Sequence, residues 1–413
     1  PGFADAIKLL QGSSAAFANF ESTAFDVRNF TGHADAENGG LWLRTAPDVL
    51  PDVRKMGINL VARANNHATD WGYEGMRETD RLLDDAEIVH AGTGETRALA
   101  RAARYLATPQ GRVALVSMTS TFTPSSRSMD ALNQTLARPG VSAVRLRERI
   151  MVSPQMLRSL RQFHAAQPLG AVDAPADTTS TELTLFGTSY RASPAIKDRM
   201  AYSYGVDSTD VKEIMAAVRQ GKSNADFLVA TIHAHEPGNW SEPPADFLPG
   251  LAHAAIDNGA DAFVGHGPHR LRGIEIYRGR PIFYSLGNFF FQIASHEPIP
   301  QDLYEEMGKD PRTTSDAELH GWFERNFFRG ANGPTWYRSV IAVCRYEGGS
   351  VSEIRLYPLE LGYGEEGITR GVPRLATPEI SRQILETLAR LSTPYGTTIT
   401  VEGSVGIIRP QIR

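Results

Sequence analysis

Short apolar segments alternate with helical patterns along most of the chain. Five of these segments are apolar and end in polar or glycine-containing turns, as strands buried in a sheet do: residues 15–20, 58–64, 113–119, 227–233 and 262–265. Between them, apolar side chains recur at helical spacing in residues 46–56, 73–86 and 247–258. The alternation predicts an α/β fold built in layers, and it disfavours a helical bundle or a sandwich of hairpins.

The pattern changes after residue 272. Residues 274–277 and 282–284 flank a turn and predict a β-hairpin, 351–359 predict a strand, and 378–391 predict an amphipathic helix. Two polar segments, 119–206 and 297–334, are expected to be insertions that form lids, substrate-binding walls or disordered excursions. We therefore expect one catalytic domain over residues 1–295, with an insertion at about 119–206. Residues 296–413 are expected to form an extension that packs on the same domain.

Polar clusters follow four of the predicted strands. They are residues 19–21 (NFE), 65–67 (NNH) with Asp70, 233–236 (HAHE) and 265–269 (GHGPH). Loops at the carboxyl ends of strands in an open α/β sheet converge on one crevice. Residues that are far apart in the sequence are therefore expected to meet there.

The side chains in these clusters suit a metal site. Imidazole, amide and carboxylate groups form a mixed nitrogen and oxygen set that fits zinc, manganese or iron(II), without the thiolates of structural zinc sites. A lone histidine is more often a surface or core residue, but five of the eleven histidines lie in these clusters. The GHGPH run is the most specific, because glycine and proline fix a tight loop that presents two imidazoles. The NNH run alone would serve equally well as a helix cap.

Four motifs in this order resemble the poly-gamma-glutamate synthesis protein CapA family, a branch of the calcineurin-like metallophosphoesterases. They are residues 64–75 (ANNHATDWGYEG), the His233 segment, residues 265–269 and residues 285–289 (SLGNF). The resemblance spans most of residues 1–295. It implies an α/β/β/α four-layer sandwich of the calcineurin-like metallophosphoesterase fold, with a two-metal centre between the sheet edges.

The resemblance also implies roles for single residues. The implied metal ligands are Glu21, Asn66, His233, His266 and His269. The candidate acid, base or otherwise catalytic residues are His67, His235, Asp70 and His269. Which of His233 and His235 fills the family's ligand position is left open. The implied cofactor is a divalent metal, as two ions of Mn, Zn, Fe or Ca.

Two departures from the family pattern affect the expected metal count. Family members begin with a strand that ends in Gly-Asp, whose aspartate binds metal, and this sequence has no such motif. Either the motif lies before Pro1 or one metal site is incomplete. Glu21 also stands where ordinary phosphoesterases have aspartate, and the histidine loop has an additional proline. Phosphate chemistry therefore does not follow from the scaffold alone.

Several reactions are open to such a centre. A metal pair polarises a carbonyl or phosphoryl oxygen and activates water, which permits hydrolysis of an amide or a phosphate ester. With an acid and a base on opposite faces, it can also invert a peptide α-carbon. CapA-like proteins are linked to gamma-glutamyl polymers and peptide modification, including epimerisation, so a peptide or polyglutamyl substrate is implied. A non-catalytic accessory protein that binds capsule polymer is the alternative from a different class.

Three arginines beside the motifs are candidates for gripping a substrate carboxylate or phosphate: Arg63, Arg270 and Arg272. Solvated surface arginines are the competing interpretation. Asn288 is a candidate hydrogen-bond partner beside the site, or part of a simple turn.

Charge and composition narrow the partners. A formal net charge of -5 and a pI near 6.2 give no broad cationic field, which argues against nucleic acid or an anionic membrane as a partner. No apolar run approaches the roughly twenty residues of a membrane span, and no signal segment is evident, so a cytoplasmic location is expected. The one cysteine, Cys344, is expected in a core strand. The oligomeric state is left open.

Overall fold

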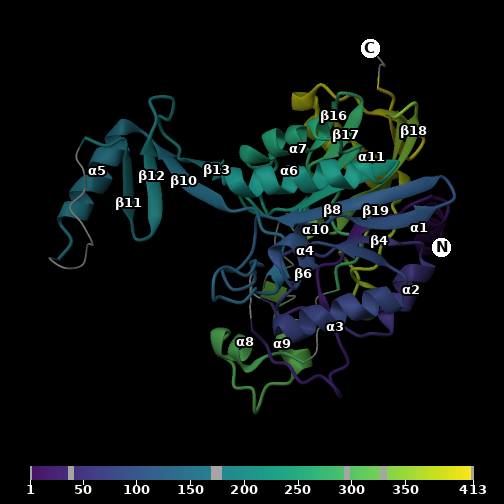
Figure 1. Ribbon diagram of the computed structural model, residues 1–413, viewed down its shortest axis with the longest axis horizontal. Coiled ribbons are helices and arrows are strands. Elements are labelled where there is room, and N and C mark those ends of the chain that lie inside the picture. Colours follow the sequence, from purple (N-terminus) through teal and green to yellow (C-terminus); the bar gives the residue numbers. More distant parts are fainter. Residues whose placement is uncertain are drawn as a thin grey trace.

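The computed structural model describes residues 2–35, 41–168, 179–292, 298–323, 325–326 and 333–410 (Figure 1). Its largest sheet has six strands in the order β16-β17-β15-β14-β8-β7. These strands are β7 (Arg104–Thr108), β8 (Gly111–Thr119), β14 (Phe227–His233), β15 (Ala262–His266), β16 (Ile274–Tyr277) and β17 (Arg280–Phe283). The four inner strands are parallel, and β7 and β16 run antiparallel to their neighbours.

Helices α6 (Ser208–Ser223) and α7 (Phe247–Asp257) cover one face of this sheet, with Ile214, Val218 and Leu251 among the buried contacts. The end of α7 lies where Asn258-Gly259 predicts it, and Gly259 has the positive φ of 110° that favours glycine.

A second, parallel sheet consists of β1 (Phe17–Asn19), β4 (Leu60–Ala62) and β5 (Val89–Ala91). On one face, Val61 packs with residues such as Leu50 of α2 (Val49–Lys55) and Leu83 of α3 (Gly72–Asp85). On its other face, Leu60 and Ala91 share a buried cluster with residues of β8 and β14. The two sheets therefore pack face to face, and helices cover their outer faces.

The C-terminal residues form a third sheet with its own helix. Its strands are β18 (Arg338–Glu347), β19 (Ser350–Glu360), β20 (Arg374–Leu375), β21 (Thr400–Glu402) and β22 (Val405–Ile408). Helix α11 (Pro378–Ser392) packs on it, and Ile354 and Leu385 contact a core that includes Phe283 of β17. Cys344 lies on β18, and burial raises the pKa of its thiol to about 12.

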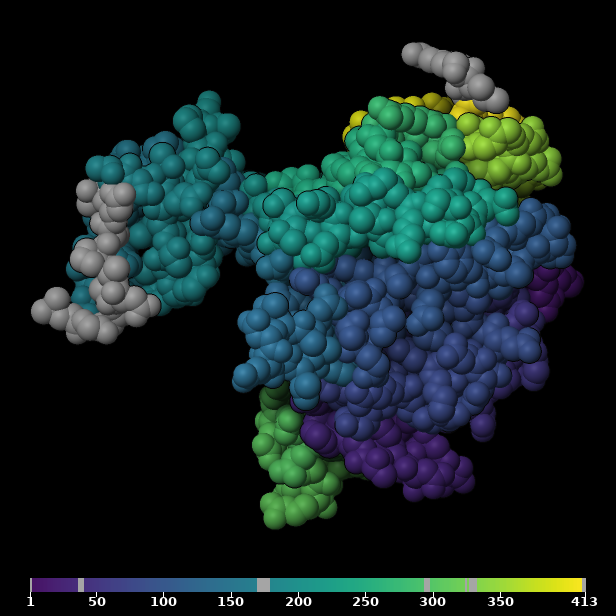
Figure 2. All heavy atoms as spheres, in the orientation of Figure 1, coloured from purple at the N-terminus to yellow at the C-terminus, as the bar shows by residue number. Residues whose placement is uncertain are grey.

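The polar segment after residue 119 includes a folded arm. Strands β10 (Leu146–Val152), β11 (Glu182–Leu185), β12 (Thr188–Ala192) and β13 (Ala201–Val206) pair in the order β11-β12-β10-β13, beside helix α5 (Pro154–Ala165). Val152, Leu157, Leu183 and Leu185 form its own small core. Figure 2 shows the arm as a separate lobe joined to the body at one end. The predicted insertion is therefore a folded arm over most of its described length.

Short elements complete the chain. They are α1 (Gly2–Gln11), β2 (Thr23–Ala24), β3 (Arg44–Thr45), β6 (Thr93–Gly94), α4 (Arg97–Arg101), β9 (Gly140–Val141), α8 (Gln301–Glu306), α9 (Asp316–Phe323), α10 (Gly333–Trp336), η3 (Gly367–Thr369) and η4 (Thr393–Tyr395). Helices α8 and α9 lie in the segment 297–334 that was expected to be an insertion, and their residues Leu303 and Leu319 join an aromatic cluster with Trp42 and Trp71. Among the described residues, no helix combines the length and apolarity of a bilayer span. The α/β prediction is confirmed.

Candidate metal centre

Four strand ends meet at one edge of the two facing sheets. Glu21 follows β1, His67 follows β4, His233 and His235 lie at and after the end of β14, and His269 follows β15. In the parallel pairing of β14 and β15, His233 stands opposite His266. The convergence predicted from the sequence therefore brings side chains from all four segments together.

One carboxylate oxygen lies at the centre of this cluster. Glu21 Oε1 is 3.6 Å from His233 Nε2, 4.0 Å from His235 Nε2 and 4.0 Å from His269 Nε2. The oxygen is buried and makes no hydrogen bond within the described part of the chain. Burying a carboxylate oxygen without a hydrogen bond costs free energy. A cation bound between this oxygen and the imidazole nitrogens would remove that cost. The residues present fit a divalent cation that prefers nitrogen and oxygen donors.

The pKa shifts in the cluster have a common physical cause. Burial, followed by the neighbouring His235 and His266, holds the pKa of His233 well below its ordinary value. Burial and the proximity of His269 lower the pKa of His235 to about 3. Burial also raises the pKa of Glu21, although His269, His67 and Asn19 oppose that shift. His233 and His235 are therefore neutral near pH 7 and have lone pairs to give to a cation.

Two asparagines orient two imidazoles of the cluster. Asn239 Oδ1 lies 2.6 Å from His235 Nδ1, and Asn288 Oδ1 lies 3.0 Å from His269 Nδ1. Because an amide oxygen only accepts, each Nδ1 donates, and each Nε2 keeps its lone pair toward Glu21. Asn288 in turn donates to the carbonyl of Trp336 at 2.9 Å. Asn288, the predicted hydrogen-bond partner, thus contacts His269, and Asn239 makes the equivalent contact to His235.

His266 lies next to this group with both ring nitrogens engaged. Its Nδ1 is 2.9 Å from His233 Nδ1, and its Nε2 is 2.9 Å from the hydroxyl of Thr231. Burial lowers the pKa of His266 to about 3. Asn19 Nδ2 donates to Glu21 Oε2 at 2.9 Å and lies 3.4 Å from His233 Nδ1. His266 therefore lies on the Nδ1 side of His233, away from the Nε2 atom that faces Glu21.

The loop after β4 places a histidine–carboxylate pair beside the cluster. His67 Nδ1 lies 2.7 Å from Asp70 Oδ2, which also accepts the backbone N–H of Leu43 at 2.7 Å. The backbone N–H of His67 donates to Asn65 Oδ1 at 3.1 Å, so Asn65 fixes the turn. Asn66 is buried and lines the same cavity as His67.

Two of the three arginines predicted to bind a substrate, Arg63 and Arg272, are buried. Arg63 is fully buried and donates to the carbonyl of Ser22 at 2.7 Å and to that of Phe20 at 3.3 Å, on either side of Glu21. Arg272 is fully buried and donates to Ser241 and Gly238 carbonyls at 3.3 Å. Full burial leaves these two arginines no surface that a substrate could contact. Their burial has a reason, because carbonyl groups that face the interior need hydrogen-bond donors. Arg63 and Arg272 therefore hold the loops that carry these carbonyls.

A cavity of about 1510 Å³ runs from the cluster into the protein. Its polar end includes Glu21, His67 and His269, and the stacked rings of Trp240 and Trp336 lie there with their centroids 4.9 Å apart. Its other end is apolar and lies between the edge strands β1 and β18, whose residues both line it.

Some residues of the site were not predicted from the sequence. Asn239, Thr231, Trp240 and Trp336 contact the cluster or its immediate neighbours, and Asn19, which belongs to the predicted NFE cluster, had no role assigned to it. Asn239 follows His235 by four residues, and Trp240 follows Asn239. Their closeness in sequence to the histidine motif is the feature that could have indicated a place at the site. Nothing near Trp336 in the sequence indicated a place beside His269.

The fold and these donors define an α/β protein with a candidate cation site at the strand ends. Residues 1–293 match the model of the family described as Bacterial capsule synthesis protein PGA_cap. This match covers more than half of the 413 residues, so the chain belongs to that family. The family resemblance found in the sequence motifs is thereby confirmed.

Similar proteins span several bacteria. A protein of Sinorhizobium fredii (strain NBRC 101917 / NGR234), named Uncharacterized protein y4sH, is 49% identical over 416 residues, 99% of this chain and 88% of the relative. Capsule biosynthesis protein CapA of Bacillus anthracis is 24% identical over 284 residues, 68% of this chain and 51% of that protein. A probable polyglutamine synthesis accessory protein of Mycobacterium tuberculosis (strain CDC 1551 / Oshkosh) is 26% identical over 298 residues, 70% of this chain and 62% of the relative.

Proposed function

We propose that this protein is a divalent-metal-dependent enzyme that hydrolyses an amide bond of a peptide or γ-glutamyl chain. The observation that carries the proposal is the buried, unpaired Oε1 of Glu21 facing the Nε2 atoms of His233, His235 and His269, in the cavity that His67 also lines. The names of the relatives, capsule biosynthesis protein and polyglutamine synthesis accessory protein, support a polyglutamyl substrate.

The cation would be held by Glu21, His233, His235 and His269, and a second ion would involve His266 and Asn66. A bound divalent cation would polarise a substrate carbonyl and lower the pKa of a bound water. His67 donates its Nδ1–H to Asp70, which fixes the ring, so Nε2 is the nitrogen that moves a proton. In amide hydrolysis, water adds its oxygen to the carbonyl carbon and gives a proton to His67 Nε2. The C–N bond then breaks as His67 passes that proton to the leaving nitrogen.

Geometry favours hydrolysis over α-carbon epimerisation. Inversion needs two proton-transfer groups on opposite faces of the α-carbon. His235, the other candidate, directs Nε2 to the Glu21 cluster and binds Asn239 through Nδ1, so both of its ring nitrogens are engaged. The His67–Asp70 pair is then the single acid–base unit that we assign.

The proposed architecture is the four-layer calcineurin-like sandwich. It is supported by the two facing sheets with helices on their outer faces. The three-stranded and five-stranded sheets would be two parts of one layer, because their edge strands β1 and β18 both border the apolar end of the cavity.

The products of one reaction test the proposal. Purified protein with Mn²⁺, Zn²⁺, Fe²⁺ or Ca²⁺ is incubated with γ-glutamyl oligomers and peptides in deuterium oxide. A new amine, lost in His67→Gln and kept in His164→Gln on α5, supports hydrolysis. Deuterium at an α-carbon without new amine would identify an epimerase, and phosphate release from esters alone would identify a phosphoesterase. Cation and polymer binding with none of these products would identify a non-catalytic accessory protein.

A further inference from the structure

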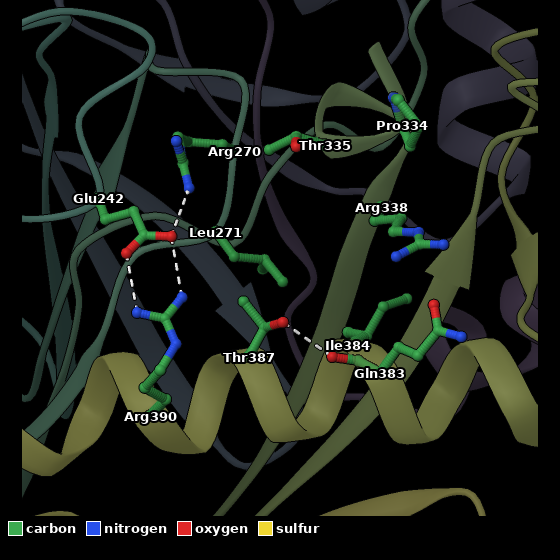
Figure 3. Close-up of a pocket in the computed structure, with 10 residues that line it drawn as sticks. All are labelled: Glu242, Arg270, Leu271, Pro334, Thr335, Arg338, Gln383, Ile384, Thr387 and Arg390. Carbon is green, nitrogen blue, oxygen red and sulfur yellow. Dashed lines mark hydrogen bonds and ion pairs between the residues drawn. The ribbon is translucent and has the colours of Figure 1, made fainter. Parts of the chain in front are cut away.

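A second pocket, of about 210 Å³, lies between the loop after β15, the start of β18 and helix α11 (Figure 3). Its ten lining residues include three arginines and one carboxylate, Arg270, Arg338, Arg390 and Glu242, so their formal charge is +2. A concave site with excess positive charge attracts and holds anions.

The one carboxylate satisfies only two of the three guanidinium groups. Both Glu242 oxygens accept from Arg390 at 2.8 Å, and Arg270 donates to Glu242 at 3.1 Å. Arg338 lies across the pocket from this group, and within the described ranges no hydrogen bond or ion pair joins its side chain to another residue. Arg270 Nε is also buried there without a hydrogen-bond partner. The pocket therefore offers unfilled donors of the kind that pair with carboxylates in a two-pronged geometry.

This pocket adjoins the candidate metal centre. Arg270 directly follows His269, whose Nε2 faces Glu21. On the other side, Arg338 follows Trp336 by two residues, and the Trp336 ring centroid lies 5.2 Å from that of His269. The two segments that carry His269 and Trp336 at the centre therefore also carry Arg270 and Arg338 of the pocket.

We propose that the pocket formed by Arg270, Arg338 and Arg390 binds a carboxylate of an extended acidic chain and so sets the register of that chain at the metal centre. The proposal rests on the proposed function for its substrate, because a polyglutamyl chain carries a carboxylate on every residue. Arg338 supplies the vacant donors, and Glu242 keeps Arg270 and Arg390 in place until the chain arrives.

Binding of a γ-glutamyl trimer to the full chain, measured by calorimetry with Mn²⁺ present, tests this inference. Arg338→Gln is expected to weaken binding about tenfold, because a charged hydrogen-bonding partner is lost. Arg382→Gln, on the exposed face of α11, is the matched control and is expected to leave the affinity unchanged. The trimer with its carboxylates amidated is expected to bind equally weakly to the wild type and to Arg338→Gln. Glu242→Gln is expected to strengthen trimer binding several-fold, because it releases two guanidinium groups.

The outcomes separate this inference from the proposed reaction. Equal trimer affinity in wild type and Arg338→Gln overturns the carboxylate pocket, whether or not the enzyme cleaves the trimer. Arg338-dependent binding of inorganic phosphate without binding of the trimer overturns the ligand class. Arg338-dependent trimer binding without cleavage supports the pocket and counts against hydrolysis.

Discussion

His67 and Asp70 form a buried pair in which the ring nitrogen Nδ1 lies 2.7 Å from the carboxylate oxygen Oδ2. The carboxylate also accepts a backbone N–H from Leu43, so it is held from two sides. The pair therefore sets the orientation and tautomer of the His67 ring.

Asp70→Asn removes the charge that orients His67 while keeping the size of the side chain. We expect kcat for amide hydrolysis to fall by roughly 10²- to 10⁴-fold, the usual contribution of a positioned acid or base. Cation affinity is expected to stay within about twofold, because Asp70 is not among the cluster atoms. Steady-state kinetics and calorimetry measure the two quantities, with the exposed Asp85→Asn as control. A loss of cation affinity equal to the loss of rate would assign Asp70 to the ligand set.

Glu21→Gln is expected to weaken Mn²⁺ or Zn²⁺ binding by at least about tenfold. The variant keeps the shape of the side chain and removes the one carboxylate among three imidazoles. Loss of even a residue that only supports a metal ligand costs about 10- to 100-fold in affinity. Titration calorimetry with chelator-treated protein gives the dissociation constants. Glu306→Gln, at an exposed position of α8, is the control. Unchanged affinity in Glu21→Gln would remove Glu21 from the site.

The cation-free protein is expected to lose stability as the pH falls from 6.5 toward 5. His235 and His266 have pKa values of about 3 in the folded chain, against 6.5 when unfolded, so only the unfolded chain takes up their protons in this window. Each therefore subtracts on the order of 1–2 kcal/mol from the free energy of unfolding at pH 5. The raised pKa values of Glu21 and Glu236 act in the opposite direction, and the lowered pKa of His233 adds to the loss.

Urea unfolding at pH 7 and pH 5 in the presence of a chelator measures this loss. His266→Gln removes one titrating ring and is expected to reduce the difference between the two pH values. The same pH difference in wild type and variant would mean that His266 is not held neutral by burial.

Arg63→Met is expected to lower the free energy of unfolding by about 3 kcal/mol, because it leaves carbonyl groups and Asp80 without their buried donor. Weaker cation binding should accompany this loss, since the two carbonyls flank Glu21. Denaturant unfolding of Arg63→Met and of the exposed control Arg158→Met gives the comparison. A higher KM for substrate with normal stability would restore the substrate-binding role that the sequence suggested.

Much of the fold followed from apolar patterning. β14 has the bounds that the sequence predicts, because its apolar run is continuous and ends at a histidine. The arm was harder to predict, because its strands carry charge on their exposed faces. Arg147 and Arg149 of β10 pair with Glu182 of β11, so the polar residues that suggested a loop are satisfied across the arm's sheet.

The sequence predicted which types of residue gather at the candidate site, but not the hydrogen bonds that hold them there. The histidine motifs indicated which side chains gather, because strand ends share one edge of a sheet. They could not indicate that Asn239 and Asn288 would hold the rings, since that depends on how loops cross in space. Arginine is usually exposed, so the burial of Arg63 and Arg272 could not be inferred from composition.

The cluster draws Glu21 from the loop after β1 and its three imidazoles from β14 and the loops after β14 and β15, so its members belong to two different layers. An ion bound by these side chains would cross-link the two layers, and its binding free energy would add to the free energy needed to separate them. Chelation should therefore loosen both layers together, and amide hydrogen exchange at the ends of β1 and β14 would quicken in step.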